Sequence, residues 1–365
     1  MIARATTADR QVDASSRSDA GAPACVPREL LERAGLRFER AISDDGDSFV
    51  TAFCRDRAGS PVVLKYVRSR SADALRRLKN ETQLVKNLEV TAPLRLLPHR
   101  SDGPGYLITA FDGGLLLQPD SFDEATVRTV ADALRQLQSI RPDFSRLGIV
   151  DREPIVAYYL KVLLKNLLHL WPTALTATEA VRCFTIVTRA LPAITRRRVI
   201  CHGDFLPTNL LYHAEDGSVT FSDLEGFICG NHMLFDVLAF FSISGLELAQ
   251  WEWQRQFLAR FLAGAADVDV RSKEYYEAYR GILVFFLVYR LNEARLALAG
   301  TTYFNGQPKG RFLLRKAVGL ATRDGWRDES AKALVVRARN LRTVLSRRGF
   351  VQHFETMHSA VTPAC

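Results

Sequence analysis

The sequence has few of the residues that organise disulfide-rich or zinc-stabilised proteins. Six cysteines are spread over 365 residues, and no two of them form a Cys-x-x-Cys pair. This spacing excludes a zinc-ribbon site and a disulfide framework as the basis of the fold. We therefore expect free thiols in a reducing compartment, and a cytoplasmic protein. The cysteines are Cys25, Cys54, Cys183, Cys201, Cys229 and Cys365.

Long apolar runs are also missing. The most apolar stretch, Ile282–Tyr289 (ILVFFLVY), is bounded by Arg280 and Arg290. It is much shorter than the roughly 20 residues of a membrane-spanning helix. The N-terminus has no apolar core of the kind found in secretory signals. We expect neither secretion nor a transmembrane segment, and residues 282–289 are predicted to lie in a buried helix.

Acidic residues are outnumbered by basic ones. The chain has 49 Lys and Arg against 40 Asp and Glu, a net charge of +9. Residues 309–348 hold 12 basic and 3 acidic residues, so this segment alone accounts for the excess. Within it, Ala331–Arg348 predicts a helix with a narrow apolar stripe flanked by arginines. We expect this helix to pack on the rest of the fold. Binding to an anionic membrane surface is the alternative, and no nucleic-acid partner is expected.

The pattern along the chain changes near residue 115. Residues 1–27 lack periodicity and are predicted to be a disordered tail. Residues 28–115 contain short apolar segments separated by turn residues, then one amphipathic segment, which predicts a small antiparallel sheet with one helix. Residues 116–365 are mostly helical in pattern. The sequence thus predicts a two-lobed α+β fold. The predicted strands are 36–42, 48–56, 61–67 and 105–114, and the predicted helix is 71–90.

One pair of charges interrupts apolar surfaces in the first lobe. Lys65 is the single charged residue of the strand 61–67, and Glu81 falls in the apolar stripe of the helix that follows. A buried carboxylate is costly unless it is paired, so the two side chains are predicted to face each other. The alternative is that both reach out to the surface of the lobe.

The second lobe concentrates polar residues in VICHGDFLPTNLLY (199–212) and, further on, in FSDLEG (221–226). Phosphoryl transfer requires a carboxylate that orients the attacking hydroxyl and accepts its proton. It also requires amide and carboxylate oxygens that hold Mg²⁺ against the phosphates. Asp204 suits the first role, and Asn209 and Asp223 suit the second. His202 is expected to hydrogen-bond the loop backbone rather than to act as a base.

Together, HGDFLPTNLL and FSDLEG resemble the signature motif of the aminoglycoside phosphotransferase and choline kinase family, which has a protein-kinase-like fold. Lys65 and Glu81 lie upstream at the spacing of that family. The resemblance covers about residues 36–242. It implies a small N-terminal lobe, a larger helical lobe, and ATP with Mg²⁺ in the cleft between them. It also implies that Asp236 braces the backbone of the catalytic loop, although this residue could instead cap a helix.

The resemblance implies a role for each candidate residue. Asp204 becomes the catalytic base, Lys65 binds phosphate and Glu81 holds Lys65. Adenine would contact the carbonyl of Thr109 and the N–H of Phe111. The remaining assignments are Ser48 at the phosphate loop, and Asn209 and Asp223 as metal ligands. Glu225 is either a further contact to Mg²⁺ or a residue that only supports the metal ligands.

Two features depart from protein kinases. The phosphate loop SDDGDSFV has one glycine, Gly46, where a full motif has three, and Glu225 stands where protein kinases have the glycine of their metal-binding loop. No APE-like segment follows. These departures favour a small-molecule kinase over a protein kinase. A nucleotide-binding pseudokinase or scaffold is the remaining alternative, and the complete set of catalytic residues argues against it.

The resemblance implies that the acceptor is a small molecule with a hydroxyl group. The balance of acidic and basic residues in the second lobe indicates which class of molecule it is. Residues 246–299 contain seven acidic and seven basic residues, and residues 120–198 contain eight and twelve. Neither region has the acidic excess that a polycationic aminoglycoside calls for. The prediction therefore tilts toward a neutral or anionic acceptor, such as a sugar or a polyol, with amino alcohols and aminoglycosides kept as candidates.

Overall fold

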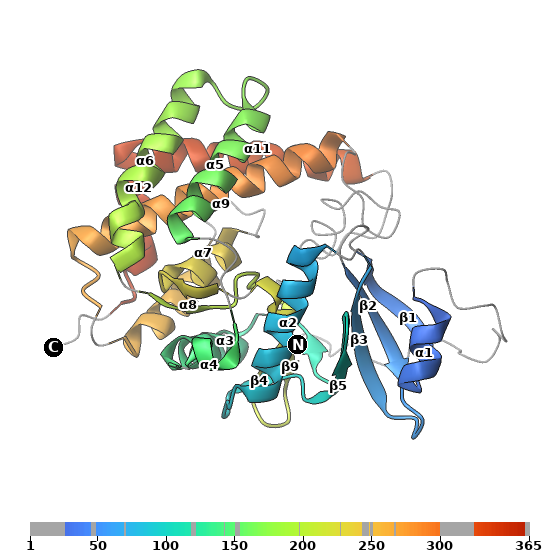
Figure 1. Ribbon diagram of the computed structural model, residues 1–365. Helices are drawn as coiled ribbons and strands as arrows, with labels where there is room; N and C mark the ends of the chain where they lie inside the picture. The colour runs from blue at the N-terminus through green and yellow to red at the C-terminus, as the bar shows by residue number, and fades with distance from the viewer. Residues whose placement is uncertain are drawn as a thin grey trace, which may run out of the picture.

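The structure is a computed structural model that describes most of the chain (Figure 1). Apart from Val26 and Pro27, the predicted disordered tail lies outside the described residues, and so does Ser48. The side chain of Glu225 is not described either, although its backbone is. The described residues are 26–44, 49–68, 71–117, 122–141, 143–149, 154–196, 198–226, 228–242, 248, 251–265, 268–299 and 325–361.

The N-terminal lobe is built on a five-stranded antiparallel sheet in the order β1-β2-β3-β6-β5. A short helix, α1 (Arg28–Ala34), which the sequence pattern did not reveal, packs on one face of this sheet with Leu30 and Leu31. Because side chains alternate along a strand, Leu64 and Tyr66 face α1 while Lys65 faces the other way. The strands are β1 (Arg37–Asp44), β2 (Phe49–Arg55), β3 (Pro61–Val67), β5 (His99–Gly103) and β6 (Tyr106–Ala110).

Helix α2 (Ala72–Asn87) borders the opposite face of the sheet. Its start is capped by the side chain of Ser71, which accepts a hydrogen bond of 3.1 Å from the N–H of Ala74. Ala74 and Leu78 are buried against the sheet. Glu81 lies about one turn beyond Leu78, so the same packing brings its carboxylate to the inner side of the lobe.

A second sheet, in the order β4-β10-β9-β7, lies where the two lobes meet. Strand β4 pairs parallel to β10, so a segment that precedes β5 and β6 in sequence joins a sheet of the C-terminal lobe. Strands β9 and β10 form an antiparallel hairpin. Strands β8 and β11 form a further antiparallel pair, and β8 directly precedes the loop of residues 202–209. The strands are β4 (Leu94–Leu96), β7 (Leu115–Leu116), β8 (Val199–Cys201), β9 (Leu210–His213), β10 (Ser218–Phe221) and β11 (Ile228–Asn231).

The rest of the C-terminal lobe is helical and is organised around α9, which packs against α5, α6, α7 and α11 (Figure 1). The apolar run 282–288 of α9 is buried, as predicted. None of the described helices is long and apolar enough to cross a bilayer. The helices are α3 (Glu124–Ser139), α4 (Phe144–Leu147), α5 (Ile155–Leu170), α6 (Ala177–Arg196), α7 (Leu234–Ser242), α8 (Glu252–Ala263), α9 (Lys273–Ala299), α11 (Gly325–Leu345) and α12 (Arg347–His358), with short 3₁₀ turns η2 (Pro207–Asn209) and η3 (Leu224–Gly226).

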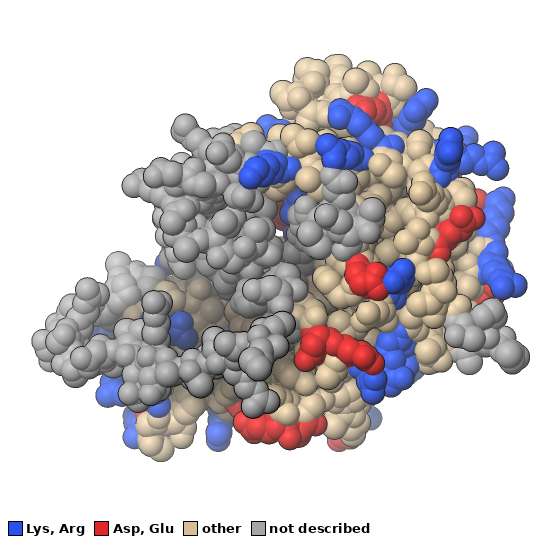
Figure 2. Space-filling view, turned by 180° about the vertical axis from the view of Figure 1, so that it is seen from behind, with Lys and Arg blue, Asp and Glu red and all other residues tan. Residues whose placement is uncertain are grey.

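The helix predicted at Ala331–Arg348 packs on the helical lobe, as expected. Leu341 of α11 is fully buried, and α11 lies along α9. One of the arginines that flank its apolar stripe, Arg337, is not exposed to solvent. This side chain is buried and donates a hydrogen bond of 2.7 Å to the carbonyl of Arg290 on α9. On the face seen in Figure 2, basic side chains are interspersed with acidic ones and do not merge into one basic surface.

The predicted fold class is confirmed. An antiparallel sheet with helix α2 comes first, and a mostly helical lobe follows. The arrangement matters for function because the inner face of the sheet, the β9–β10 hairpin and α9 all border one space.

Candidate active site

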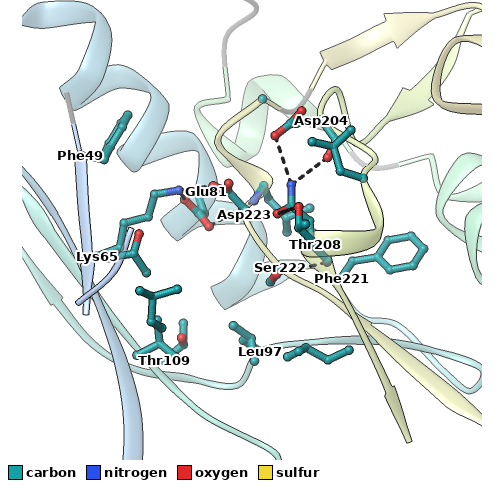
Figure 3. Close-up of a pocket in the computed structure, with 18 of the residues that line it drawn as sticks. Phe49, Lys65, Glu81, Leu97, Thr109, Asp204, Thr208, Phe221, Ser222 and Asp223 are labelled. Carbon is teal, nitrogen blue, oxygen red and sulfur yellow. Dashed lines mark hydrogen bonds and ion pairs between the residues drawn. The ribbon is translucent and has the colours of Figure 1, made fainter. Parts of the chain in front are cut away.

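A cavity of about 950 Å³ lies between the N-terminal sheet, the loop of residues 202–209 and helix α9. This volume is at the upper end of the range of small-molecule sites, roughly 300–1,000 Å³. Lys65 and Thr109 line it from the sheet, Glu81 from α2 and Asp204 from the 202–209 loop. Figure 3 shows Lys65 on one side of this space and Asp204 on the other, with Asp223 between them.

Lys65 forms ion pairs with one residue of each lobe. Its ammonium group donates to Glu81 Oε2 at 2.8 Å and to Asp223 Oδ1 at 2.5 Å. The other carboxylate oxygen of Glu81 accepts the N–H of Leu224 at 3.2 Å, so α2 also holds the segment 222–226 directly. The predicted pairing of Lys65 with Glu81 is confirmed in the geometry.

The two carboxylates respond differently to the shared ammonium. Burial is the main cause that raises the pKa of Glu81 above its usual value, and Lys65 only partly opposes it. Burial also acts to raise the pKa of Asp223, but the charge and hydrogen bond of Lys65 outweigh it and the pKa is lowered. Asp223 is therefore the carboxylate that stays ionised most readily.

The 202–209 loop is held by buried contacts with its own lobe. Asp236, inside α7, accepts the N–H of His202 at 2.7 Å and the N–H of Gly203 at 3.0 Å. The predicted bracing role of Asp236 is confirmed, and the helix-cap alternative is wrong because Asp236 lies within the helix. Gly203 has a φ of +85°, and a Cβ there would lie 1.7 Å from the carbonyl oxygen of Gly226. Only glycine permits this approach of the loop to segment 222–226.

His202 serves the loop structurally. Its ring is fully buried, and burial lowers its pKa to about 4, so the imidazole is neutral at pH 7. Nε2 lies 2.9 Å from the carbonyl oxygen of Ser222, and Nδ1 lies 3.4 Å from the N–H of Asp204. These contacts fit a tautomer in which Nε2 donates and Nδ1 accepts. The neutral ring thereby links the 202–209 loop to segment 222–226.

Asp204 is oriented by Asn209. The amide nitrogen of Asn209 donates to the backbone carbonyl of Asp204 at 2.9 Å and to its carboxylate at 3.1 Å. Burial, followed by the negative charge of Asp223, raises the pKa of Asp204 to about 6. A carboxylate with such a pKa is ionised at neutral pH yet basic enough to take a proton from a reacting hydroxyl.

The β9–β10 hairpin brings Asn209 beside Asp223. Leu210 pairs with Phe221, so the next residues outward, Asn209 and Ser222, are also adjacent. The N–H of Ser222 donates to the carbonyl of Asn209 at 3.0 Å. Asp223 then turns the chain with a φ of +62°, a conformation that Asp tolerates better than most residues. The turn places its carboxylate against Lys65.

This pair of side chains fits a magnesium ion. Mg²⁺ takes oxygen ligands and is usually held by one or two protein groups, with water and phosphate completing the shell. Asp223 offers a carboxylate. Asn209, whose amide nitrogen bonds Asp204, offers a side-chain carbonyl oxygen that the Thr208 hydroxyl contacts only at 3.5 Å. Within the described part of the chain, no group of three or more His, Cys, Asp or Glu side chains could hold a metal ion by itself.

Comparison with known proteins gives the site a context. Residues 40–282, more than half of the chain, match the sequence profile of the phosphotransferase enzyme family, APH. The chain belongs to this family. No curated protein matches the sequence. The family match covers the sheet from residue 40 onward, α2, the 202–209 loop and segment 222–226, whereas the cavity-lining residues of α9 lie beyond residue 282.

Solved structures of other phosphotransferases share the fold of this family member at low identity. An aminoglycoside phosphotransferase from Alicyclobacillus acidocaldarius is 17% identical, with a TM-score of 0.53 over 94% of this chain and 99% of that one. A mutant of the aminoglycoside phosphotransferase APH(4)-Ia, in complex with ADP and hygromycin B, is 13% identical, with a TM-score of 0.53 over 86% and 97%. A Plasmodium vivax ethanolamine kinase is 13% identical, with a TM-score of 0.50 over 83% and 82%.

The remaining candidate residues of this phosphotransferase fall in different places. Thr109 lines the cavity at the end of β6. Phe111 also lines it, but its N–H donates to the carbonyl of Pro61 at 3.1 Å. This N–H is therefore not the open donor that the resemblance implied, and Phe111 contributes a wall of the cavity instead. Ser48 and the side chain of Glu225 lie outside the described parts of the chain.

Sequence reasoning missed a cation at the Lys65 end of the cavity. Arg77 lies on α2 four residues before Glu81, and its side chain lines the cavity. Its guanidinium carbon is 4.9 Å from the ring centre of Phe49, and the ammonium of Lys65 is 5.0 Å from the same ring. The i,i+4 spacing from Glu81, which places both residues on one helix face, was a usable signal.

Sequence reasoning also missed three residues at the opposite end. Tyr289, Arg290 and Glu293 of α9 line the cavity near Asp204. Arg290 lowers and Glu293 raises the pKa of Asp204, which shows that both charges act on it. Their local sequence carries no signal of this, because only the packing of α9 in the lobe brings them to the 202–209 loop.

Proposed function

We propose that this protein is an ATP-dependent kinase of small molecules, which transfers the γ-phosphoryl group of ATP to a hydroxyl group of the acceptor. One observation carries the proposal. Asp204, Asn209, Asp223 and the Lys65–Glu81 pair come from four separate segments and meet in one cavity. Together they supply the parts that phosphoryl transfer requires.

The nucleotide would occupy the end of the cavity under the N-terminal sheet. Lys65 would bind the phosphates while Glu81 keeps its ammonium in place. Thr109 and Phe111 would flank the adenine as wall residues. Arg77 lies on the same side and adds a second cation near the phosphates. In the described structure Lys65 also contacts Asp223, so phosphate binding would exchange one anionic partner of Lys65 for another.

Asn209 and Asp223 would hold Mg²⁺, and Glu225 is a further candidate ligand. The ion, when bound, would reduce the negative charge on the phosphates and fix their orientation. Asp204 acts on the acceptor. It accepts the hydroxyl proton as the acceptor oxygen bonds to the γ-phosphorus, the bond from that phosphorus to the bridging oxygen breaks, and ADP leaves. Asn209 keeps the Asp204 carboxylate aimed at the incoming hydroxyl.

The acceptor is proposed to be a sugar, a polyol or an amino alcohol, with aminoglycosides kept as candidates.

A cytoplasmic location suits both ATP supply and the thiols of Cys54, Cys183 and Cys201, which are free and buried. Burial raises the pKa of each of these thiols, so they are unreactive core residues and not participants in the chemistry.

The test is acceptor-dependent formation of ADP from Mg·ATP, measured over a panel of hydroxyl compounds. The proposal expects at least one acceptor to raise ADP formation well above the rate without acceptor, and a phosphorylated product to appear. Tight Mg·ATP binding without transfer to any acceptor would instead support the alternative of a nucleotide-binding scaffold.

A further inference from the structure

The end of the cavity near Asp204 has a wall built by one helix. Tyr289, Arg290 and Glu293 occupy positions i, i+1 and i+4 of α9 and line the cavity together. Arg290 Nη1 donates to Glu293 Oε2 at 2.7 Å, and the side chains are 7% and 23% exposed. Arg337 of α11 donates to the Arg290 carbonyl at 2.7 Å, so a second helix holds this wall in place. A wall supported in this way is preorganised for a ligand.

The Arg290 side chain is not saturated by its ion pair. Its Nε is buried and has no hydrogen-bond partner among the described residues. Burial acts to lower its pKa, but Glu293, Tyr289 and Asp204 outweigh this and the pKa is raised, so the guanidinium stays charged. A buried donor without an acceptor is costly, and a shift of the side chain that brings Nε to an oxygen of a bound molecule would remove that cost.

Charge at this wall is balanced. Arg290 and Glu293 neutralise each other, and the buried guanidinium of Arg337, whose charge acts on both, offsets the negative charge of Asp204 at this end. The same balance holds for the whole cavity, because its described lining has four basic and four acidic residues. They are Arg40, Lys65, Arg77 and Arg290, against Glu81, Asp204, Asp223 and Glu293.

This balance discriminates between acceptor classes. A polycation needs several unpaired carboxylates, and Glu293 is already paired. An acceptor with its own carboxylate would bring a negative charge close to both Asp204 and Glu293. A neutral molecule with several hydroxyl groups meets neither problem, because its hydroxyls can donate to Glu293 and accept from Arg290 without leaving a buried charge unpaired.

We propose that Tyr289, Arg290 and Glu293 form the acceptor subsite and that they select a neutral polyhydroxylated acceptor, a sugar or a polyol, over cationic and anionic ones. This inference rests on the proposed phosphotransferase function. In this subsite, the ring of Tyr289 forms the apolar part of the wall. The Arg290–Glu293 ion pair hydrogen-bonds the acceptor hydroxyl groups next to the one that Asp204 binds.

The first experiment compares kcat/KM across three sets of probes at fixed Mg·ATP, with the product followed by ³¹P NMR. The neutral probes are hexoses, pentoses, cyclitols and alditols, the cationic probes are ethanolamine and kanamycin, and the anionic probe is D-glycerate. We expect the best neutral probe to exceed every charged probe at least tenfold. A charged probe that is the best acceptor, or no transfer to any neutral probe, overturns the inference. No transfer to any probe at all overturns the proposed function as well.

The second experiment changes the charge of the wall. Arg290→Gln leaves Glu293 unpaired, so the ratio of kcat/KM for ethanolamine to that for the best neutral probe should rise at least tenfold. Glu293→Gln leaves Arg290 unpaired, and the corresponding ratio for D-glycerate should rise. Arg295→Gln is the matched control, because this arginine lies on the same helix, bonds Asn292 at 3.2 Å and is not among the cavity-lining residues.

The outcomes separate a selective wall from a merely structural ion pair. Melting temperature and Mg·ATP affinity are measured for each variant to confirm folding. If Arg290→Gln does not fold, Glu293→Gln decides the question, with Arg290→Lys as a charge-conserving companion that should keep the wild-type preference. Variants that fold but lose activity equally for all probes, with unchanged ratios, overturn the inference.

Discussion

The two ends of the cavity are built in different ways. The proposed nucleotide end joins both lobes through Lys65, which contacts Glu81 of α2 and Asp223 of the C-terminal lobe. The proposed acceptor end, with Asp204, Asn209 and the wall of α9, belongs to the C-terminal lobe alone. Relative motion of the lobes would therefore disturb nucleotide contacts first, while the geometry around Asp204 would persist. The comparison predicts that variants at the two ends fail in different assays.

The largest effect is expected from Asp204→Asn. This change keeps the size of the side chain and the Asn209 contact to the backbone but removes the base. Transfer activity should fall by at least about 10²–10⁴-fold. Mg·ATP affinity and melting temperature should change little, because Asp204 lies at the acceptor end. Steady-state kinetics and calorimetry on one preparation provide both measurements, and near-normal turnover would remove Asp204 from the mechanism.

Next in size is the response of metal-dependent nucleotide binding. Asp223→Ala should abolish Mg²⁺-dependent binding of ATP, because the ion loses its charged ligand. Asn209→Ala removes a neutral ligand and should weaken binding less, although it should lower turnover because Asp204 loses its orienting amide. Isothermal titration of Mg·ATP against both variants ranks them. The reverse order would contradict the proposed metal site.

A smaller effect tests the bridge between the lobes. Lys65→Ala and Glu81→Ala should be non-additive in Mg·ATP affinity, with a coupling energy of about 0.5–3 kcal/mol, because the two side chains act as one unit. The exposed pair Lys86 and Asp102, 3.0 Å apart and anchored in part by the same helix, is the matched control and should couple by about 1 kcal/mol or less in stability. Additive losses at Lys65 and Glu81 would mean that the observed ion pair does not position the lysine.

The smallest effect concerns pH. Burial and Asp223 raise the pKa of Asp204 to about 6, so its base form is lost as the pH falls through that value. The value of kcat/KM, which reports the free enzyme, should decline about tenfold per unit below about pH 6. His202, with its pKa lowered to about 4 by burial, should not contribute a second step in this range. A profile that is flat down to pH 5 would contradict the role of Asp204.

Much of the candidate site could be predicted because its signals are local. Lys65 and Glu81 stand out as charges in apolar surroundings, and the spacing of Asp204 and Asn209 belongs to a recognisable motif. The exact backbone partners could not be predicted. Phe111 lost its implied contact because its N–H bonds Pro61 across the sheet, and such pairing depends on strand register rather than on the residue itself.

The sequence by itself determined the elements and the chemistry they carry. Alternation along β3 turned Lys65 inward, and a glycine before Asp204 allowed the 202–209 loop to approach segment 222–226. Both follow from local backbone geometry, with a period of two in strands and a missing Cβ at position 203. Phosphoryl transfer could accordingly be predicted before any contact was known.

Only the tertiary structure decided what surrounds Asp204. Arg290 and Glu293 line the same cavity and act electrostatically on Asp204, and Arg337 is buried against Arg290, because α9 packs in the centre of the helical lobe and α11 lies along it. In sequence these residues look like ordinary charges on amphipathic helices. Their position in the cavity wall depends on contacts between distant segments. These contacts arise from the packing of apolar helix faces and cannot be predicted from the local sequence pattern.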